Sequence, residues 1–165
     1  MGVVVLSGCD VVYRFLDKPG AEEKALIGNA LPYEPNPTVE QIQSLLKVYG
    51  YYSAKIDGIL GRKTRAAIAR FQRDNGLEET RFVDRNTWDR MNIFEGTELI
   101  HNGRLNIRLI QKILQNEEFN PGKVDGKLGP KTTAAIKAFQ KAHGLIPDGK
   151  VGYKTLCVFR RYIKL

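Results

Sequence analysis

Residues 56–77 of this chain read IDGILGRKTRAAIARFQRDNGL, and residues 124–145 read VDGKLGPKTTAAIKAFQKAHGL. The second stretch follows the first at an offset of 68 residues, and the correspondence extends without a gap in both directions. Roughly 19 of 54 aligned positions are identical. Self-similarity at a fixed spacing indicates a repeated structural unit, so the chain is predicted to contain two copies of one fold.

The first repeat is predicted to fold as three helices. Apolar residues recur at helical spacing over 39–49, after a capping-box start in which Thr38 is the expected N-cap and Gln41 lies three residues later. A second helix is expected over about 62–75, and a short third helix follows Asp84 as its N-cap. Three helices in each copy give an all-α fold class.

The second repeat carries matching signals. Asn106 is the expected N-cap of its first helix, and Pro130 lies in the first turn of its second helix, where a missing N–H is harmless. The second helix of each repeat should bury one face, which in the first repeat is formed by Ala66, Ala67, Ile68 and Phe71.

The segment before the first repeat is predicted to be a flexible tether. Residues 17–37 contain Pro19-Gly20 and three further prolines, which are typical of a linker. Such a stretch has a root-mean-square reach of roughly 25 Å. The predicted organisation is an N-terminal segment with its tether, a first module, a connector and a second module, over 1–37, 38–92, 93–104 and 105–165.

A set of residues recurs in both repeats around the second helix. In the first repeat these are Asp57, Gly58, Gly61, Thr64, Ala67, Phe71, Gln72, Gly76 and Leu77. The pattern resembles the peptidoglycan-binding-like family, a three-helix module found on bacterial wall hydrolases. The resemblance covers about two thirds of the chain. It implies two tandem three-helix modules that bind the glycan and peptide stems of the cell wall.

The third helix distinguishes the two repeats. The second repeat continues to match the family at Asp148-Gly149, Gly152 and Thr155. The first repeat departs from the pattern there, because Thr80-Arg81 and Asp84 stand at the corresponding positions.

Most of the recurring residues are expected to be structural. Asp57 and Asp125 resemble catalytic carboxylates, but an Asp before Gly in a turn more commonly accepts hydrogen bonds from nearby backbone N–H groups. Gln43, Gln72 and their counterparts are expected to brace loop backbone. The recurring glycines, Gly58, Gly61, Gly126 and Gly129, are expected to supply turn geometry.

The expected ligand-binding residues lie where the second helix begins. Wall stems carry carboxylates, and a helix start presents N–H groups and a positive dipole end that favour an anion. The candidates in the two repeats are Arg62, Lys63, Thr64, Arg65, Lys131 and Thr132. The alternative for the basic residues is ordinary surface charge.

Tyr52 and its counterpart Asn120 form a second candidate ligand surface. Tyr52 is not aromatic in the second repeat, so it is expected to face solvent, where its ring can stack on a sugar. Tyr51 matches Phe119 and is expected in the core.

Leu6-Ser7-Gly8-Cys9 resembles the lipobox of bacterial lipoproteins, which implies a lipid on Cys9 and membrane anchoring at the cell envelope, on its periplasmic or extracellular face. Only eight residues precede Cys9 and none is basic, whereas a signal peptide needs a basic region and about 7–15 apolar residues. Either the native start lies upstream of Met1, or the resemblance is a coincidence and Cys9 is an ordinary free thiol.

Catalysis is not expected. The chain contains no HExxH and no GxSxG motif, and Cys157 lies in a short apolar segment without a neighbouring His. Two histidines exclude a histidine-rich metal site, and nothing in the sequence indicates a cofactor. We therefore expect no catalytic residues, no metal and no cofactor.

The net charge of +8 favours an anionic partner, and residues 104–165 carry thirteen basic and four acidic side chains. Nucleic acid is the less favoured partner, because the basic residues are scattered over several helices without a helix-turn-helix or RNA-binding signature. A protein-binding adaptor with the same fold remains an alternative to wall binding.

Overall fold

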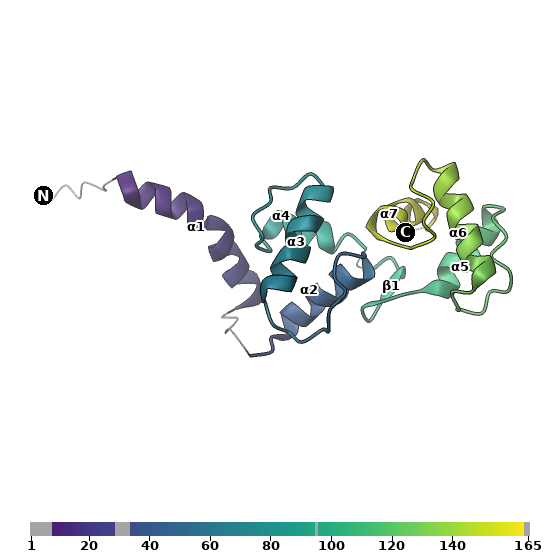
Figure 1. Ribbon diagram of the computed structural model, residues 1–165, viewed down its shortest axis with the longest axis horizontal. Coiled ribbons are helices and arrows are strands. Elements are labelled where there is room, and N and C mark those ends of the chain that lie inside the picture. Colours follow the sequence, from purple (N-terminus) through teal and green to yellow (C-terminus); the bar gives the residue numbers. More distant parts are fainter. Residues whose placement is uncertain (1–7, 29–33, 95, 164–165) are drawn as a thin grey trace, which may run out of the picture. The chain divides into compact units, whose positions relative to one another are not determined.

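The structure of the chain is a computed structural model, which describes residues 8–28, 34–94 and 96–163, with side chains described from residue 18 onward. Most of the described chain is helical, and its two short strands form an antiparallel hairpin (Figure 1). The elements in chain order are α1 Gly8–Ile27, α2 Pro37–Val48, α3 Arg62–Asp74, α4 Arg85–Met91, β1 Ile100–His101, β2 Arg104–Leu105, α5 Ile107–Asn116, α6 Pro130–Ala142, α7 Tyr153–Phe159 and the 3-10 helix η1 Arg160–Tyr162.

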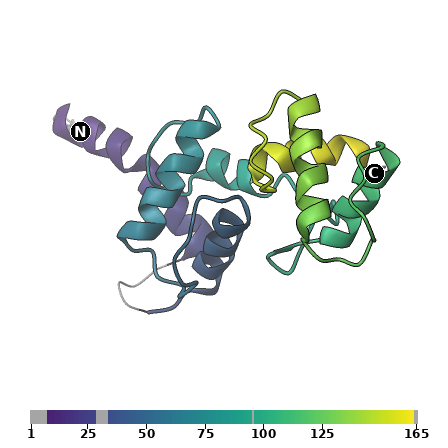
Figure 2. The same ribbon diagram turned by 45° about the vertical axis from the view of Figure 1, so that its right-hand side comes forward.

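Each repeat folds as the three expected helices, α2 to α4 and α5 to α7 (Figure 2). The expected start of α4 is confirmed, because Asp84 Oδ1 accepts from the N–H of Thr87 at 2.7 Å. Asn106 caps α5 by accepting from the N–H of Leu109 at 3.1 Å, and Pro130 is the first residue of α6. The all-α prediction is confirmed.

Two local expectations are wrong. The side chain that caps α2 belongs to Asn36, whose Oδ1 accepts from the N–H groups of Thr38 and Val39 at 2.9 and 3.2 Å. The helix begins at Pro37, whose fixed φ and missing N–H suit the first helical position. On α3, Ala66 is exposed, because the buried stripe follows the helical period through Thr64, Ala67, Ile68, Phe71 and Gln72.

The prediction that the recurring glycines supply turn geometry is confirmed for the Asp-Gly turns. It is wrong for the glycine that precedes the second helix of each repeat. Gly58 and Gly126 have φ of +71° and +78°. A Cβ on Gly58 would lie 2.7 Å from the backbone N of Asn36, so this turn needs glycine for space as well as for conformation. Gly61 and Gly129 both have φ of −86°, which other residues adopt.

The compact units do not follow the repeat boundaries. The first unit comprises Met1–Ile42 and Ala54–Met91, and the second comprises Gln43–Ser53 and Asn92–Leu165. Residues 43–53, which belong to the first repeat in sequence, therefore group with the second unit.

Three aromatic residues explain this grouping within the second unit. The rings of Tyr49 and Tyr153 meet edge to face at 5.1 Å between centroids, and Phe94 lies 5.8 Å from Tyr49 and 5.5 Å from Tyr153. All three are buried, and burial raises the pKa of Tyr49 well above its usual range. Phe94 comes from the expected connector, so part of that connector is core.

The segment before α2 differs from the expected linker. Residues 18–27 continue α1 through Pro19, and α1 packs against α4. Glu23 and Ile27 are buried, and the side-chain Nδ2 of Asn36 donates to the carbonyl of Ile27 at 2.9 Å. These tertiary contacts stabilise a helix where the local Pro-Gly signal favours a turn. Pro32 lies outside the described residues, and Cys9 lies in the part of α1 without described side chains.

Candidate functional site

A buried glutamine holds the loop that leads into α6. Gln111 Nε2 donates to Asp125 Oδ1 at 3.1 Å, to the Lys127 carbonyl at 3.0 Å and to Thr132 Oγ1 at 3.1 Å. Its Oε1 accepts from the N–H of Gly126 at 2.7 Å. Because one amide satisfies several loop groups away from water, Gln111 fixes the position of the helix start.

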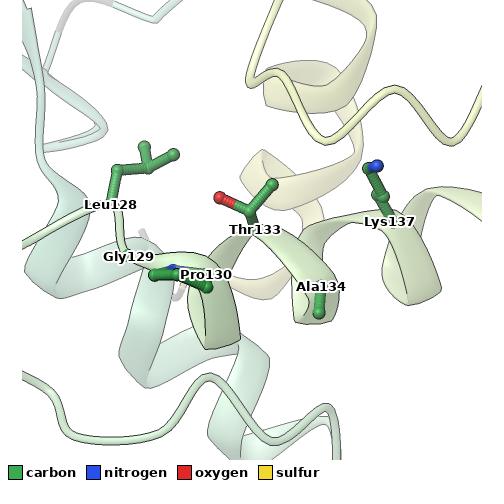
Figure 3. Close-up of a pocket in the computed structure, with 6 residues that line it drawn as sticks. All are labelled: Leu128, Gly129, Pro130, Thr133, Ala134 and Lys137. Carbon is green, nitrogen blue, oxygen red and sulfur yellow. The ribbon is translucent and has the colours of Figure 1, made fainter.

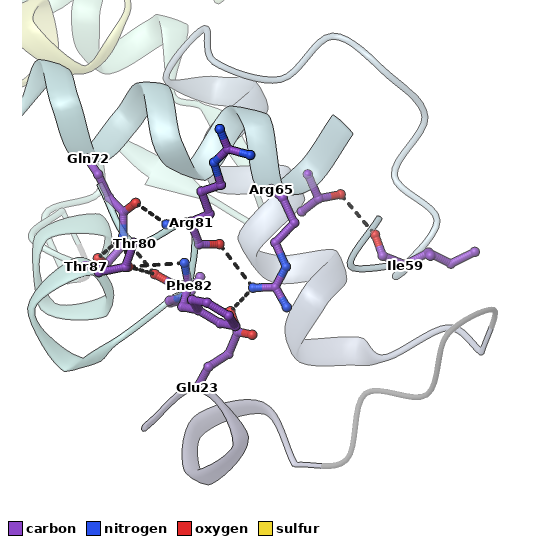
Figure 4. Close-up of polar contacts among 10 residues, drawn as sticks. Glu23, Ile59, Arg65, Gln72, Thr80, Arg81, Phe82 and Thr87 are labelled. Atoms are coloured by element: carbon purple, nitrogen blue, oxygen red, sulfur yellow. Dashed lines mark hydrogen bonds and ion pairs between the residues drawn. The ribbon is translucent and has the colours of Figure 1, made fainter. Parts of the chain in front are cut away.

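The same brace recurs elsewhere, as expected for the other glutamines. Gln140 Nε2 donates to Asp148 Oδ1 at 2.9 Å and to Thr155 Oγ1 at 3.1 Å, and its Oε1 accepts from the N–H of Gly149 at 2.8 Å. In the first repeat, Gln72 makes the corresponding bonds to Thr80, Arg81, Phe82 and Thr87 (Figure 4).

The two aspartates before glycine accept hydrogen bonds, as predicted. Asp57 Oδ1 accepts from the N–H of Ile59 at 3.0 Å. Asp125 Oδ1 accepts from Gln111 Nε2 and from the N–H of Lys127 at 2.9 Å. The hydrogen bond from Gln111 and then that from Lys127 lower the pKa of the Asp125 carboxyl.

Asp125 therefore gives a test by pH. A carboxyl with a lowered folded-state pKa contributes stability above its unfolded pKa, and that contribution is lost as the pH falls through the folded value, here below the usual 3.8. We expect Asp125→Asn, which keeps the acceptor oxygen without the charge, to lose less stability than the wild type between pH 5 and the acid range of about pH 2–3. Melting temperatures measured across this range on both proteins check it, and parallel curves would contradict it.

Two of the expected ligand residues have buried hydroxyls. Thr64 Oγ1 donates to the carbonyl of Ile59 at 2.9 Å, and Thr132 Oγ1 donates to the carbonyl of Pro121 at 3.1 Å. Both residues are almost fully buried. Their hydroxyls therefore belong to the framework that holds the helix start.

The structure brings Asn120 and Lys131 together, as candidate ligand residues of the second repeat. Both are exposed. Asn120 Oδ1 accepts from the N–H of Gly122 at 3.0 Å, and the Lys131 stem lies 3.1 Å from where a Cβ on Gly122 would be. An exposed amide and an exposed ammonium thus flank one turn beside the start of α6.

The expectation that Tyr52 faces solvent is wrong. Its side chain is 6% exposed, and its hydroxyl accepts from Gln43 Nε2 at 3.3 Å. The chain turns back after α2, where the N–H of Tyr52 donates to the carbonyl of Leu46 at 3.1 Å, and this turn carries the ring inward. Tyr52 therefore has no free ring face on which a sugar could stack.

The basic residues at the start of α3 divide between two environments. Arg62 and Lys63 are exposed. Arg65 pairs with the buried Glu23 of α1 at 2.6 Å and donates to the carbonyl of Arg81 at 3.1 Å (Figure 4). Its guanidinium also lies 4.6 Å from the centre of the Phe82 ring. Arg65, which the sequence predicts to bind a ligand, is thus paired with the carboxylate of Glu23.

A pocket of about 460 Å³ lies beside the start of α6 in the second unit (Figure 3). It is open to solvent, since Leu128 on its wall is 48% exposed. The lining residues come from the loop end and from one face of α6: Leu128, Gly129, Pro130, Thr133, Ala134 and Lys137. In the view of Figure 3, the side chains of Leu128, Thr133 and Lys137 project to the same side.

The sequence predicts ligand-binding residues at the start of α6, but not the face of α6 that lines the pocket. The helical period places Thr133 and Lys137 one turn apart, away from Lys131. The sequence feature that could have identified this face is the difference between the repeats. At the offset of 68, Thr133 corresponds to Arg65 and Lys137 corresponds to Ala69.

The described residues limit the other kinds of site. Within 8–28, 34–94 and 96–163, no cluster of three or more His, Cys, Asp or Glu is arranged to hold a metal ion. In the same ranges, no helix combines the length and the apolar character needed to cross a membrane.

Comparisons with known proteins agree on the repeated unit. The model of the family described as "Putative peptidoglycan binding domain" matches residues 35–91 and 104–158. An N-acetylmuramoyl-L-alanine amidase, CwlL of Bacillus licheniformis, is 30% identical over 142 residues, which are 78% of this chain and 36% of the amidase. The localization factor PodJL of Caulobacter vibrioides is 35% identical over 72 residues, which are 44% of this chain and 7% of that protein.

The chain spans little more than a third of the amidase and a small part of the localization factor. No solved structure matches the chain significantly. The two family matches together cover well over half of the 165 residues and coincide with α2 to α4 and α5 to α7. The chain therefore belongs to the peptidoglycan binding domain family, of which it carries two tandem copies.

Proposed function

We propose that this chain binds peptidoglycan without catalysis, through the α6 side of its second repeat. The observation that carries the proposal is the open pocket beside the basic start of α6, on a module of a peptidoglycan binding family. The pocket is shallow and open, and its walls are mainly apolar with a few polar groups. Lys131 and Asn120 flank the same helix start and add charge and hydrogen-bonding groups.

Electrostatics support the second repeat as the main binding module. Residues 104–165 carry thirteen basic and four acidic side chains, whereas wall stems carry carboxylates. In the first repeat, Arg65 is paired with Glu23 and Thr64 is buried, which leaves Arg62 and Lys63 as the exposed candidates there.

The test is paired sacculus binding and thermal melting on the full chain. Lys131→Ala should weaken retention on purified sacculi while the free energy of unfolding changes by no more than about 0.5 kcal/mol, because the side chain is exposed. Lys112→Ala, on the exposed face of α5, removes the same charge elsewhere and is the control. Retention should also fall as salt rises, since exposed charges are screened beyond about 8 Å at physiological ionic strength. Salt-independent retention, or stronger binding of nucleic acid than of sacculi, would contradict the proposal.

We further propose that the chain holds an envelope protein at the wall, with anchoring through a lipid on Cys9 when its native upstream sequence is present. The support is the lipobox-like Leu6-Ser7-Gly8-Cys9 and the wall ligand implied by the family. Mass spectrometry of the mature N-terminus tests it, and an unprocessed chain with Met1 intact would rule out the anchor.

A protein-binding adaptor is the second candidate function. It is favoured by the similarity to a protein named as a localization factor, and by the helix α1 that the first repeat already holds through Glu23. Capture of protein partners by a variant that has lost sacculus binding would support this candidate over wall binding.

A further inference from the structure

The first repeat contains a carboxylate site that its own chain fills. Glu23 of α1 is 4% exposed, and its Oε1 lies 2.6 Å from Arg65 Nη1 (Figure 4). The same oxygen accepts from the backbone N–H of Val83 at 2.8 Å. An ion pair and a buried backbone N–H thus converge on one carboxylate oxygen. Such charge-assisted bonds are about twice as strong as neutral ones.

The second repeat has the same backbone at the corresponding place. Val151 corresponds to Val83 at the offset of 68, and Gly149 corresponds to Arg81. The φ angles of Arg81 and Gly149 are +66° and +76°, so the two loops share an unusual conformation. Each loop is held by its own glutamine, Gln72 or Gln140.

In the second repeat this site is not filled by the described chain. Val151 is 6% exposed, and no hydrogen bond from its N–H to another residue is found within 8–28, 34–94 and 96–163. Backbone N–H groups of folded chains nearly always have a partner, so this N–H is available to an acceptor from outside these residues. The corresponding N–H of the first repeat, that of Val83, donates to the carboxylate of Glu23.

The charge near this place suits a carboxylate. Lys137 and Thr133 line the pocket, and their side chains lie 2.8–3.2 Å from where a Cβ on Gly149 would be, two residues before Val151. Lys137 corresponds to the buried Ala69 of the first repeat. The basic side chain of the second repeat therefore lies one helical turn after the position that corresponds to Arg65, on the same helix face.

We infer that the Val151 N–H and Lys137 form the carboxylate subsite of the second repeat, and that Glu23 fills the equivalent subsite of the first. The inference rests on the proposed function, and the ligand is a free carboxylate of a short wall stem peptide. Lys137 also lines the open pocket, which offers a surface to a short peptide, whereas α1 in the first repeat relies on helix packing that includes the buried Ile27.

Amide chemical shifts of the full, nitrogen-15-labelled chain test the subsite. The probes are a soluble muropeptide with free stem carboxylates and the same muropeptide with those carboxylates amidated. We expect the Val151 amide to move on addition of the first and not of the second. Lys137→Ala, which places the first repeat's residue there, should weaken muropeptide affinity roughly tenfold, in line with the loss of one charge-assisted bond. Lys112→Ala is the matched control and should bind like the wild type.

The subsite of the first repeat, which Glu23 fills, provides a second test. The Val83 amide should not respond to the muropeptide in the wild type, and it should respond in Glu23→Ala, where the carboxylate is removed. Glu22→Ala removes a neighbouring charge and should leave Val83 unresponsive. A Val83 amide that stays unresponsive in Glu23→Ala would overturn the equivalence of the two sites.

The remaining outcomes separate this inference from the proposed function. Retention on sacculi with an unresponsive Val151 amide would overturn the subsite and leave wall binding intact. Failure of the full chain to bind sacculi would overturn the proposed function itself. A Val151 amide that responds to an acidic helical peptide at lower concentration than to the muropeptide would overturn the wall ligand in favour of a protein partner.

Discussion

Phe139→Ala is expected to lower the free energy of unfolding of the second compact unit by about 3–5 kcal/mol. Phe139 is fully buried on α6, and its ring stacks on Phe159 at 4.4 Å between centroids. Phe119 and Tyr162 meet the same ring edge to face at 5.4 and 5.9 Å. Removing the ring leaves a cavity at the centre of this cluster. Because domains are stable by only about 5–15 kcal/mol, the loss is a large part of the total.

Denaturant unfolding followed by circular dichroism measures this effect. The control is Ile146→Ala, which shortens an apolar side chain that is 82% exposed and should change stability by no more than about 0.5 kcal/mol. A Phe139→Ala protein as stable as the Ile146→Ala protein would contradict the packing described here. Sacculus binding should be lost in Phe139→Ala together with the fold and not before it.

Phe94→Ala is expected to cost a similar amount, about 3–5 kcal/mol. Phe94 is 2% exposed and contacts the rings of Tyr49 and Tyr153. The side chain joins residues 43–53 to the rest of the second unit, so its loss should loosen that segment as well as reduce global stability. Hydrogen exchange of the amides over 43–53, measured beside denaturant unfolding, reports both effects.

Phe94→Leu is the matched variant for this position. Leucine keeps much of the apolar volume and should recover most of the stability, because volume-conserving core changes usually cost less than about 1.5 kcal/mol. Equal exchange rates over 43–53 in the wild type and Phe94→Ala would show that Phe94 does not hold the segment.

The repeat and its helices were predictable because their signals are local or periodic. The offset of 68 residues aligned two copies, and in each copy the helical spacing located the elements. The Asp-Gly turns were predictable for the same reason. Asp57 and Asp125 bond backbone N–H groups only two residues away, and turn chemistry of that range is encoded in the sequence itself.

The candidate site was predictable only in part. The sequence predicts Lys131 at the start of α6 and Asn120, the counterpart of Tyr52, as separate candidates, but it did not reveal the pocket face with Thr133 and Lys137. The polar counterpart of Tyr52 predicts that this residue faces solvent, but the turn after α2 buries it. A difference between repeats identifies a variable position, but exposure depends on what packs over it.

The sequence by itself determined that this chain has two three-helix modules of a peptidoglycan binding family, because that information lies in periodicity and in residues close together along the chain. Only the tertiary structure decided that Arg65 pairs with Glu23 and that Phe94 lies in the hydrophobic core. The partner of Arg65, Glu23, lies 42 residues away, behind a Pro-Gly pair that favours a turn. Such contacts depend on which distant segments fold together, and the free energy of that packing overrides the local preference.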